Sequence, residues 1–545
     1  MSSLTSSDKA SPPQSRQKPG SACEECRRRK LRCDRQQPRC RFCSESSVVC
    51  TFTSSRPPRG PKKGHLKVLQ ARIAALEGRL NQQQNDERFV DLADETVANG
   101  IEIEDETHIP VSIHSDDAET PPQDPLPGMK TVDASVSLPE TCISDIMQAD
   151  LDQLYFDRVH SFAPFLHQRR YYSWNRQPAK TEFRTCLQFA MWTLAASVSA
   201  QFQNIGDPLY RDTRQKLEAL ELKDTSIESI DIEQVQAWIL LAIYEFMRTD
   251  YRRGWMSAGR AFRLIQLMRL HEIDAPNCIP MQIDWIEIEE RRRTFWMAYS
   301  LDRFISIRNE WPLTLSDSVI MIRLPAPEVE FQSGQPILMG FLSEAITAND
   351  QSAMSPFTEC TILATISGRA LSHRHQSLVE NIYVDASQDF WERHQWINAT
   401  LTDRMQIMSH KYPPALQHVD SMLLFTSMMA QAAVLYLYKI MMRVTPATEE
   451  NQAVMMEYQT RSLIAAQEIA NLSKILPQLS RFKVHPFTPI PLSLCAEFFT
   501  SYRDLDDSVY VQLHDILEAL RSLRRFNNLA QCILHLFELE SVEGL

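Results

Sequence analysis

Six cysteines near the N-terminus have the spacing of metal ligands. They follow the pattern C-x2-C-x6-C-x6-C-x2-C-x6-C, and they are Cys23, Cys26, Cys33, Cys40, Cys43 and Cys50. Two sulfurs separated by two residues can hold one ion from a tight turn, and structural zinc takes four ligands in a tetrahedron. Two ions need eight ligand positions, whereas six thiolates supply six, so two cysteines must each bind both ions. The spacing therefore predicts a binuclear cluster of two zinc ions with two bridging thiolates.

The pattern is nearly a repeat of C-x2-C-x6-C, which makes the first cysteine of each half the natural bridge. We expect one zinc ion to be bound by Cys23, Cys26, Cys33 and Cys40, and the other by Cys23, Cys40, Cys43 and Cys50. The basic residues that follow Cys26 offset the net negative charge of this cluster. Two alternatives stay open. One is a set of disulfides, and the other is a single-zinc or protein-interaction zinc module, RING-like or LIM-like, of a kind that uses eight ligands for two ions without bridging.

The segment from Cys23 to Cys50 resembles the fungal Zn(II)2Cys6 DNA-binding domain, on the residues Cys26-Arg-Arg-Arg-Lys-Leu-Arg-Cys33 and Pro38. The resemblance implies a short helix that enters the major groove, with Lys30 reading a CGG-type triplet and Arg29 beside it. Lysine and arginine donate hydrogen bonds to O6 and N7 of guanine, which fits such a triplet. Leu31 is expected to pack beneath the helix. The remaining basic residues are expected to contact phosphates or to offset the cluster charge, and they are Arg27, Arg28, Arg32, Arg35, Arg39 and Arg41.

Charge along the 545-residue chain is strongly uneven. Residues 1–85 carry 18 Lys/Arg and 6 Asp/Glu, residues 86–145 carry 2 and 16, and the whole chain has a net charge of −12. A polyanionic partner is therefore expected for the first 85 residues only. The first 20 residues have no apolar run, so we expect no secretory signal and a reducing compartment. The 13 glycines form no GxGxxG, GxxxxGK[ST] or GxSxG motif, and HExxH is also missing, so we expect no enzyme.

The segments beside the cysteines suggest how they are arranged on DNA. Residues 1–20 are expected to be disordered, 21–52 to form the DNA-binding domain, and 53–64 to be a basic linker that also serves in nuclear localisation. Residues 65–84 show a heptad pattern that predicts a short dimeric coiled coil. Its a and d positions are Leu66, Leu69, Ile73, Leu76 and Leu80. The alternative is an amphipathic helix that folds back on its own chain, because only about two heptads are present.

Residues 85–145 are acidic and rich in proline, which predicts a disordered linker. The alternation of apolar and acidic residues from Ile101 to Pro110 is also compatible with an activation segment.

The rest of the chain has the periodicity of helices. We expect helices at Gln234–Arg248, Gly259–His271 and Glu287–Ile307, with Phe295, Trp296 and Tyr299 on a buried side. Residues 146–335 resemble the fungal-specific transcription factor domain, also called the middle homology region. The matching motifs include Trp255-x3-Gly259-x-Ala261-x-Arg263 and Glu290-x-Arg292-Arg293-x-Phe295-Trp296-x2-Tyr299-x2-Asp302-Arg303. Residues 336–545 are expected to continue this regulatory domain as helices, so the fold class is mostly α.

Two features of the helical body have more than one interpretation. Arg292, Arg293, Tyr299, Asp302 and Arg303 are expected to form a buried polar network, with a site for an anionic effector as the alternative. The uncharged run from Ser421 to Tyr438 is expected to be a buried core helix and not a membrane span.

Together these patterns predict a nuclear, zinc-dependent, sequence-specific regulator of RNA polymerase II genes. It is expected to be an activator that binds paired CGG-like triplets as a homodimer and contacts the transcription machinery or co-regulators, with no membrane association. The alternatives are a zinc-stabilised interaction scaffold, an enzyme with an unrecognised site in the helical body, a repressor, and a pathway-specific regulator of a secondary-metabolite gene cluster.

Overall fold

The chain divides into two units, residues 1–130 and residues 131–545, and each is described by itself. The computed structural model describes part of the first unit and most of the second. The described residues are 22–34, 36, 38–46, 48–51, 143–223, 230–276, 284–347, 354–383, 387–413, 419–444, 449–480, 482–502 and 507–543. The N-terminal segment, the basic linker, the coiled coil and the acidic linker up to residue 142 fall outside these residues, so those four assignments stay predictions. The linker is expected to end at residue 145, whereas α4 already begins at Asp145 with Ser144 as its N-cap residue.

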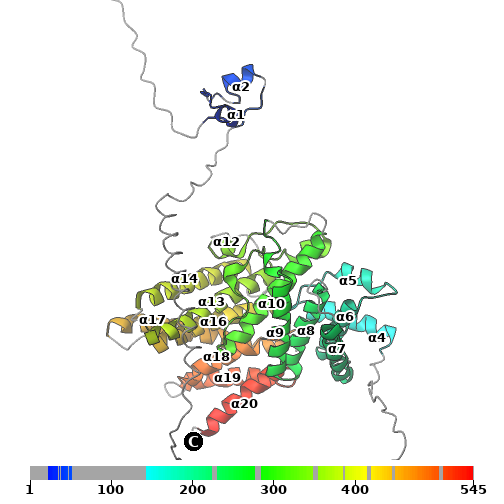
Figure 1. The fold of residues 1–545 in the computed structure, drawn as a ribbon. Helices are drawn as coiled ribbons and strands as arrows, with labels where there is room; N and C mark the ends of the chain where they lie inside the picture. Colours follow the sequence, from blue (N-terminus) through cyan, green and yellow to red (C-terminus); the bar gives the residue numbers. More distant parts are fainter. Residues whose placement is uncertain are drawn as a thin grey trace, which may run out of the picture. The chain divides into compact units, whose positions relative to one another are not determined.

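The first unit contains two one-turn helices, α1 (Glu24–Arg28) and α2 (Arg41–Glu45) (Figure 1). Buried cysteine side chains hold them together. Cys23 directly precedes α1, and Cys40 is the N-cap residue of α2, so the two halves of the cysteine repeat begin in the same way. Five of the six cysteines are buried, and they form the core of this small unit. The repeat in the sequence is thus also a repeat of local structure.

The regular elements in the described residues of the second unit are helices, joined by turns and loops, and these residues also contain one isolated bridge between Arg323 and Phe341. Its first part contains α4 (Asp145–Leu154), a π-helical turn (Tyr155–Val159), α5 (Gln168–Asn175), α6 (Glu182–Ser197), α7 (Gln203–Lys223), α8 (Ile232–Arg248), α9 (Tyr251–Leu267), a 3-10 turn (Leu270–Glu272) and α10 (Trp285–Asn309). Side-chain caps set several of these starts: Thr181 accepts a hydrogen bond from the Arg184 amide at α6, and Asp250 accepts one from the Arg253 amide at α9. Helix α8 packs against α6, α9 and α10, and nearly all of its side chains are buried.

In the later part of this unit, helix α13 makes the main contact with α10. It contains a 3-10 turn (Asp317–Val319), α11 (Glu328–Ser333), α12 (Leu342–Thr347), α13 (Pro356–Tyr383), α14 (Ser387–Lys411), α16 (Ser421–Val444), α17 (Glu449–Ser473), a 3-10 turn (Leu476–Gln478), α18 (Pro489–Thr500), α19 (Asp507–Leu523) and α20 (Asn528–Glu543). Helix α16 is central here, since it contacts α13, α14, α17 and α18, while α20 reaches back to α8. One hydrophobic core therefore runs through both parts of the helical body.

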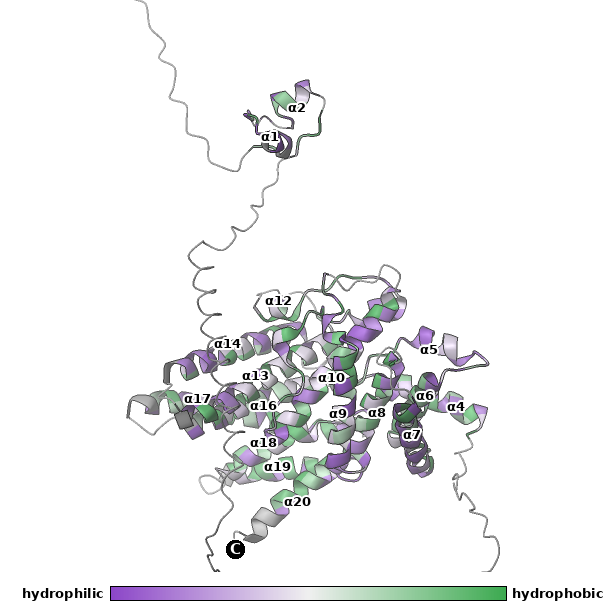
Figure 2. Cartoon of the chain, in the orientation of Figure 1, coloured by the Kyte–Doolittle hydropathy of each residue, from purple (hydrophilic) through white to green (hydrophobic). Residues whose placement is uncertain are grey.

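The three helices expected from periodicity are present. Helix α8 begins two residues before the expected start, and α10 extends two residues beyond each expected end. The second helix differs most, because Gly259–His271 is expected, whereas α9 begins at Tyr251 and ends at Leu267. Only one helix among the described residues, Ser421–Arg443, is long and apolar enough to cross a membrane. Of its most apolar 18-residue segment, 89% is buried inside the protein. The expected core helix is thus confirmed. Figure 2 shows the contrast between hydrophilic α7 and the more apolar α18 and α19.

Candidate zinc cluster and DNA interface

The sulfurs of four cysteines meet at the centre of the first unit. Cys23, Cys26, Cys40 and Cys43 place their Sγ atoms within 4.8 Å of one another. The Cys23 sulfur lies 3.7 Å from that of Cys40 and 3.7 Å from that of Cys43, and the Cys26 sulfur lies 3.6 Å from that of Cys40. Cys33 is in contact with Cys26, and Cys50 is in contact with Cys43, so each remaining cysteine adds to a different end of the group.

These distances fit zinc. A Zn–S bond of about 2.3 Å in a tetrahedron places two sulfurs of one ion about 3.8 Å apart. The three measured separations, 3.6 to 3.7 Å, are close to that edge length. Cys23 and Cys40 each approach a sulfur of the other half, which is what a thiolate shared by two ions requires.

Backbone amides support the same two sulfurs in matching ways. The Cys26 amide donates to the Cys23 sulfur at 3.5 Å, and the Cys43 amide donates to the Cys40 sulfur. The latter bond, together with the neighbouring thiols and against the effect of burial, lowers the pKa of Cys40 to about 6. Burial raises the pKa of Cys26 and Cys43. The Cys43 amide thus stabilises the thiolate form of Cys40.

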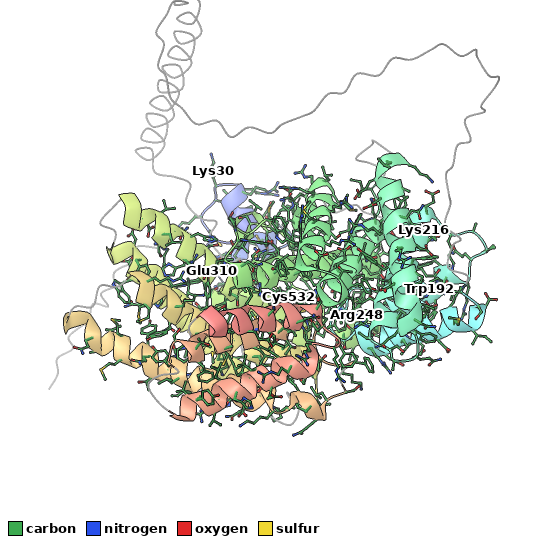
Figure 3. All side chains as sticks on the ribbon, turned by 90° about the horizontal axis from the view of Figure 1, so that it is seen from below. Lys30, Trp192, Lys216, Arg248, Glu310 and Cys532 are labelled. Atoms are coloured by element: carbon green, nitrogen blue, oxygen red, sulfur yellow. The ribbon has the colours of Figure 1, made fainter. Side chains whose placement is uncertain are left out.

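Lys30 has a backbone conformation that is uncommon for a residue with a side chain. Its φ of 57° is left-handed, and the Leu31 amide donates back to the Cys26 carbonyl at 2.8 Å, which ends α1 in a Schellman-type turn. Glycine normally takes this position, so lysine costs on the order of 1 kcal/mol. The side chain is exposed and extends away from the short ribbon of its unit (Figure 3). Such strain is typical of a functional position.

Two comparisons agree with this geometry. Residues 21–59 match the fungal Zn(2)-Cys(6) binuclear cluster domain, and residues 153–402 match the fungal specific transcription factor domain. The second match extends beyond residue 335, where the sequence placed a boundary, and that boundary stays a prediction. The chain belongs to the fungal Zn(2)-Cys(6) transcription factors.

Curated relatives in this family match nearly the whole chain. The chain is 47% identical to a pigment biosynthesis transcriptional activator of Monascus ruber, with all of this chain and 98% of the relative covered. It is 48% identical to a citrinin biosynthesis transcriptional activator of Monascus purpureus, with 96% and 93% covered. It is 46% identical to an azaphilone cluster-specific transcription factor of Aspergillus niger, with 86% and 96% covered. Its family thus makes this chain a zinc-dependent, DNA-binding transcription factor and not an enzyme.

The basic residues of the Zn(2)-Cys(6) domain fall into two groups. Glu25 is paired with Arg28 at 2.7 Å and with Arg29 at 2.5 Å, and Glu45 is paired with Arg41 at 2.9 Å. Lys30, Arg32 and Arg39 are exposed and make no ion pair with any described residue. The side chain of Arg27 and all of Arg35 lie outside the described part of the chain. Lys30, Arg32 and Arg39 are accordingly the cations most available to DNA.

Three details of this domain were not expected from the sequence. Asp34 accepts hydrogen bonds from the Arg41 amide at 3.1 and 3.2 Å and so covers the start of α2, which no local pattern indicates. Glu25 forms ion pairs with both Arg28 and Arg29, which lie three and four residues further along the chain and therefore on the same side of α1. Leu31 is 43% exposed, so the expectation that it packs beneath α1 is wrong. The cysteine sulfurs fill the core of this unit, which leaves Leu31 on the surface beside Lys30.

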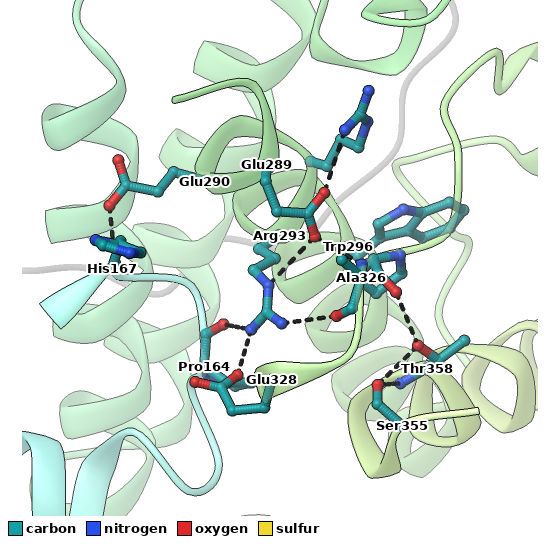
Figure 4. A network of polar contacts seen from close by, with 12 residues as sticks. Pro164, His167, Glu289, Glu290, Arg293, Trp296, Ala326, Glu328, Ser355 and Thr358 are labelled. Carbon is teal, nitrogen blue, oxygen red and sulfur yellow. Dashed lines mark hydrogen bonds and ion pairs between the residues drawn. The ribbon is translucent and has the colours of Figure 1, made fainter. Parts of the chain in front are cut away.

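In the fungal-specific domain, Arg293 of the second motif is the centre of a buried polar network (Figure 4). Its guanidinium group is 1% exposed and binds Glu289 at 3.3 Å and Glu328 at 2.6 Å. It also donates to the carbonyl oxygens of Pro164 at 2.5 Å and Ala326 at 2.7 Å. The network joins α10 to the segment before α5 and to the start of α11.

A second arginine of the motif is equally enclosed. Arg303 is 1% exposed, stacks over the Tyr299 ring at 3.3 Å, pairs with Asp302 and donates to the Leu315 carbonyl. Asp302 accepts from the Leu315 amide at 2.9 Å. Arg293 and Arg303 are thus each paired with a carboxylate and with main-chain oxygens, so the expected buried polar network is confirmed in the described residues.

Proposed function

We propose that this transcription factor is a nuclear activator devoted to one secondary-metabolite gene cluster. The observation that carries the proposal is the identity of 46–48%, over at least 86% of this chain, with two biosynthesis transcriptional activators and one cluster-specific transcription factor. Identity at this level extends over the helical body as well as the zinc cluster.

At the DNA, we propose that Cys23, Cys26, Cys33, Cys40, Cys43 and Cys50 hold two zinc ions and that Lys30 reads a CGG-like triplet. The support is the sulfur geometry and the exposed, strained Lys30. One cluster reads about three base pairs, which is too few to address a genome, so a second copy is needed. We assign the dimer contact to the heptad residues of 65–84, which lie outside the described part of the structure.

The regulatory role is tested in the cell. The chromosomal copy is replaced by Lys30→Ala, with Arg521→Ala on the surface of α19 as the matched control, and all transcripts are measured. We expect the transcripts of one contiguous group of biosynthetic genes to fall at least about tenfold in Lys30→Ala only, since a good base contact contributes about 1–3 kcal/mol. A rise would show a repressor, and no change at equal protein level would contradict the proposal.

The dimer is tested by sedimentation of the full chain. Ile73→Asp places a charge at a predicted a position, whereas Ala74→Asp places the same charge at the neighbouring b position. We expect Ile73→Asp to sediment as a monomer and Ala74→Asp as a dimer. Dimers in both variants would show that the contact lies elsewhere.

A further inference from the structure

A cavity of about 660 Å³ lies between α16, α18 and α20, far along the chain from the motifs that define the family. Aromatic side chains line much of it, among them Tyr438, Phe498, Tyr502 and Phe537. Its size falls within the range of small-molecule sites, and an apolar wall with a few polar groups is the usual composition of such sites.

The polar side of the cavity is cationic. Lys439 and Arg443 line it, and both share the carboxylate of Glu310 with Arg374, which lies deeper. Lys439 Nζ is 2.9 Å from Glu497 and 3.3 Å from Glu310. These three cations face two carboxylates, so one positive charge is left over.

Arg443 carries that excess charge. Its guanidinium is 3.7 Å from Glu310, the longest of the three contacts to these carboxylates that involve Lys439 or Arg443, and its side chain is 49% exposed. Glu310 itself sits at the left-handed end of α10, with a φ of 55°, and is labelled in Figure 3. Arg443 is thus free to turn toward an added anion at no loss of a short ion pair.

A buried hydroxyl in the same wall has no partner. Tyr436 is 1% exposed, lines the cavity, and its hydroxyl makes no hydrogen bond within the described residues. Burial raises the pKa of this hydroxyl, which keeps it a neutral donor. A buried polar group without a partner is costly, on the order of 1–3 kcal/mol, and a ligand oxygen would relieve that cost.

We propose that this cavity binds a small aromatic molecule with one negative charge, its rings against Phe498 and Tyr438 and its anionic group beside Arg443 and the Tyr436 hydroxyl. The site differs from the buried network of Arg293 and Arg303, where every charge is already paired. The proposal goes beyond the proposed function and does not rest on it, because binding can be measured without DNA.

The test uses the zinc-loaded full chain and two fluorescent probes with nearly the same rings. One is 1-anilinonaphthalene-8-sulfonate, which is a monoanion, and the other is N-phenyl-1-naphthylamine, which is neutral. We expect one saturable site for the anion per chain, measured by fluorescence and by calorimetry, with at least about fivefold weaker binding of the neutral probe.

Variants place the probe in the cavity. Arg443→Gln should weaken the anion at least about fivefold and leave the neutral probe unchanged, and Tyr436→Phe should weaken the anion more than the neutral probe. Thr500→Trp, at the partly exposed end of α18, should block both probes. Arg521→Gln, on α19, is the charge-matched control and should change neither.

Three results would overturn the proposal. The first is binding of the anionic probe at many weak sites that none of the variants affects. The others are equal affinity for the two probes and unchanged probe binding in Thr500→Trp. Thermal unfolding of each variant shows whether that variant folds. Arg443→Gln replaces a half-exposed side chain, so this variant keeps the test valid if a variant at a more buried residue fails to fold. DNA selection should be the same for all of these variants, which separates this result from the proposed function.

Discussion

The sulfurs of Cys23 and Cys40 lie 3.7 Å apart, and each also lies within 3.7 Å of a sulfur from the other half of the repeat. The two cysteines are 17 positions apart in the sequence, yet they take equivalent places: one directly precedes α1 and the other is the N-cap residue of α2. Equivalent sulfurs at the centre of the group are the ones that two ions would share.

Zinc content separates a bridging cysteine from a terminal one. Cys40→Ser removes a ligand from both ions, so we expect less than one zinc per chain and loss of DNA binding. Cys50→Ser removes one ligand from one ion and should retain about one tightly held zinc. Atomic absorption on the dialysed full chain gives both numbers. Two retained ions in Cys40→Ser would contradict the bridge.

Lys30 combines an exposed cation with a left-handed backbone, and two substitutions separate these properties. Lys30→Ala removes the cation and keeps the strain, whereas Lys30→Gly removes both. We expect both to lose triplet preference by about 10- to 100-fold and to keep two zinc ions, with Lys30→Gly the more stable by about 1 kcal/mol. The measurements are competition binding and thermal unfolding. Retained preference in either variant would contradict the assignment of Lys30 as the base reader.

Removing Arg293 should destabilise the helical body strongly. Arg293→Ala leaves the buried Glu289 with less counter-charge and two carbonyl groups without their donor, so we expect a loss of about 3–5 kcal/mol in the free energy of unfolding. Arg291→Ala, one position away, breaks a partly exposed pair with Glu287 and should cost at most about 0.5 kcal/mol. Urea unfolding compares them, and similar losses would refute the structural role of the network.

Glu290 gives the helical body a defined response to pH. Burial, opposed by Arg170, raises the pKa of this carboxyl to about 7, while it accepts a 2.8 Å bond from the His167 amide. The unfolded chain ionises near 4.5, so stability from this group is full below that pH and is lost as pH rises through about 7. Glu290→Gln should therefore gain stability relative to the native chain between pH 4.5 and 8, by up to about 3 kcal/mol. A difference that stays constant over this range would contradict the shifted pKa.

Much of the candidate site could be predicted because its signal is local. Cysteine spacing decides which sulfurs can share an ion, and helical periodicity locates the strongly patterned α8 and α10. The buried pairs of Arg293 and Arg303 were expected as a network, but their partners Pro164, Ala326 and Leu315 are main-chain groups far apart in the sequence, which no side-chain pattern marks.

Other features had no readable signal at all. The left-handed backbone of Lys30 belongs to the turn that ends α1, in which the Leu31 amide bonds to the Cys26 carbonyl. A lysine in the sequence does not predict a left-handed residue. The exposure of Leu31 is not predicted either, since an aliphatic residue in so small a unit competes for space with five buried cysteines. The cavity between α16, α18 and α20 depends on helices from separate parts of the chain, so only the tertiary structure brings Tyr436, Arg443 and Phe498 together.

The most direct test of the account is selection of random DNA by the full chain loaded with zinc, repeated after chelation. We predict enrichment of two CGG-like triplets at one fixed spacing, lost with the chelator and absent in Lys30→Ala. Enrichment of a single triplet would contradict the dimer, and no zinc-dependent enrichment would contradict the central claim that this cluster reads DNA sequence.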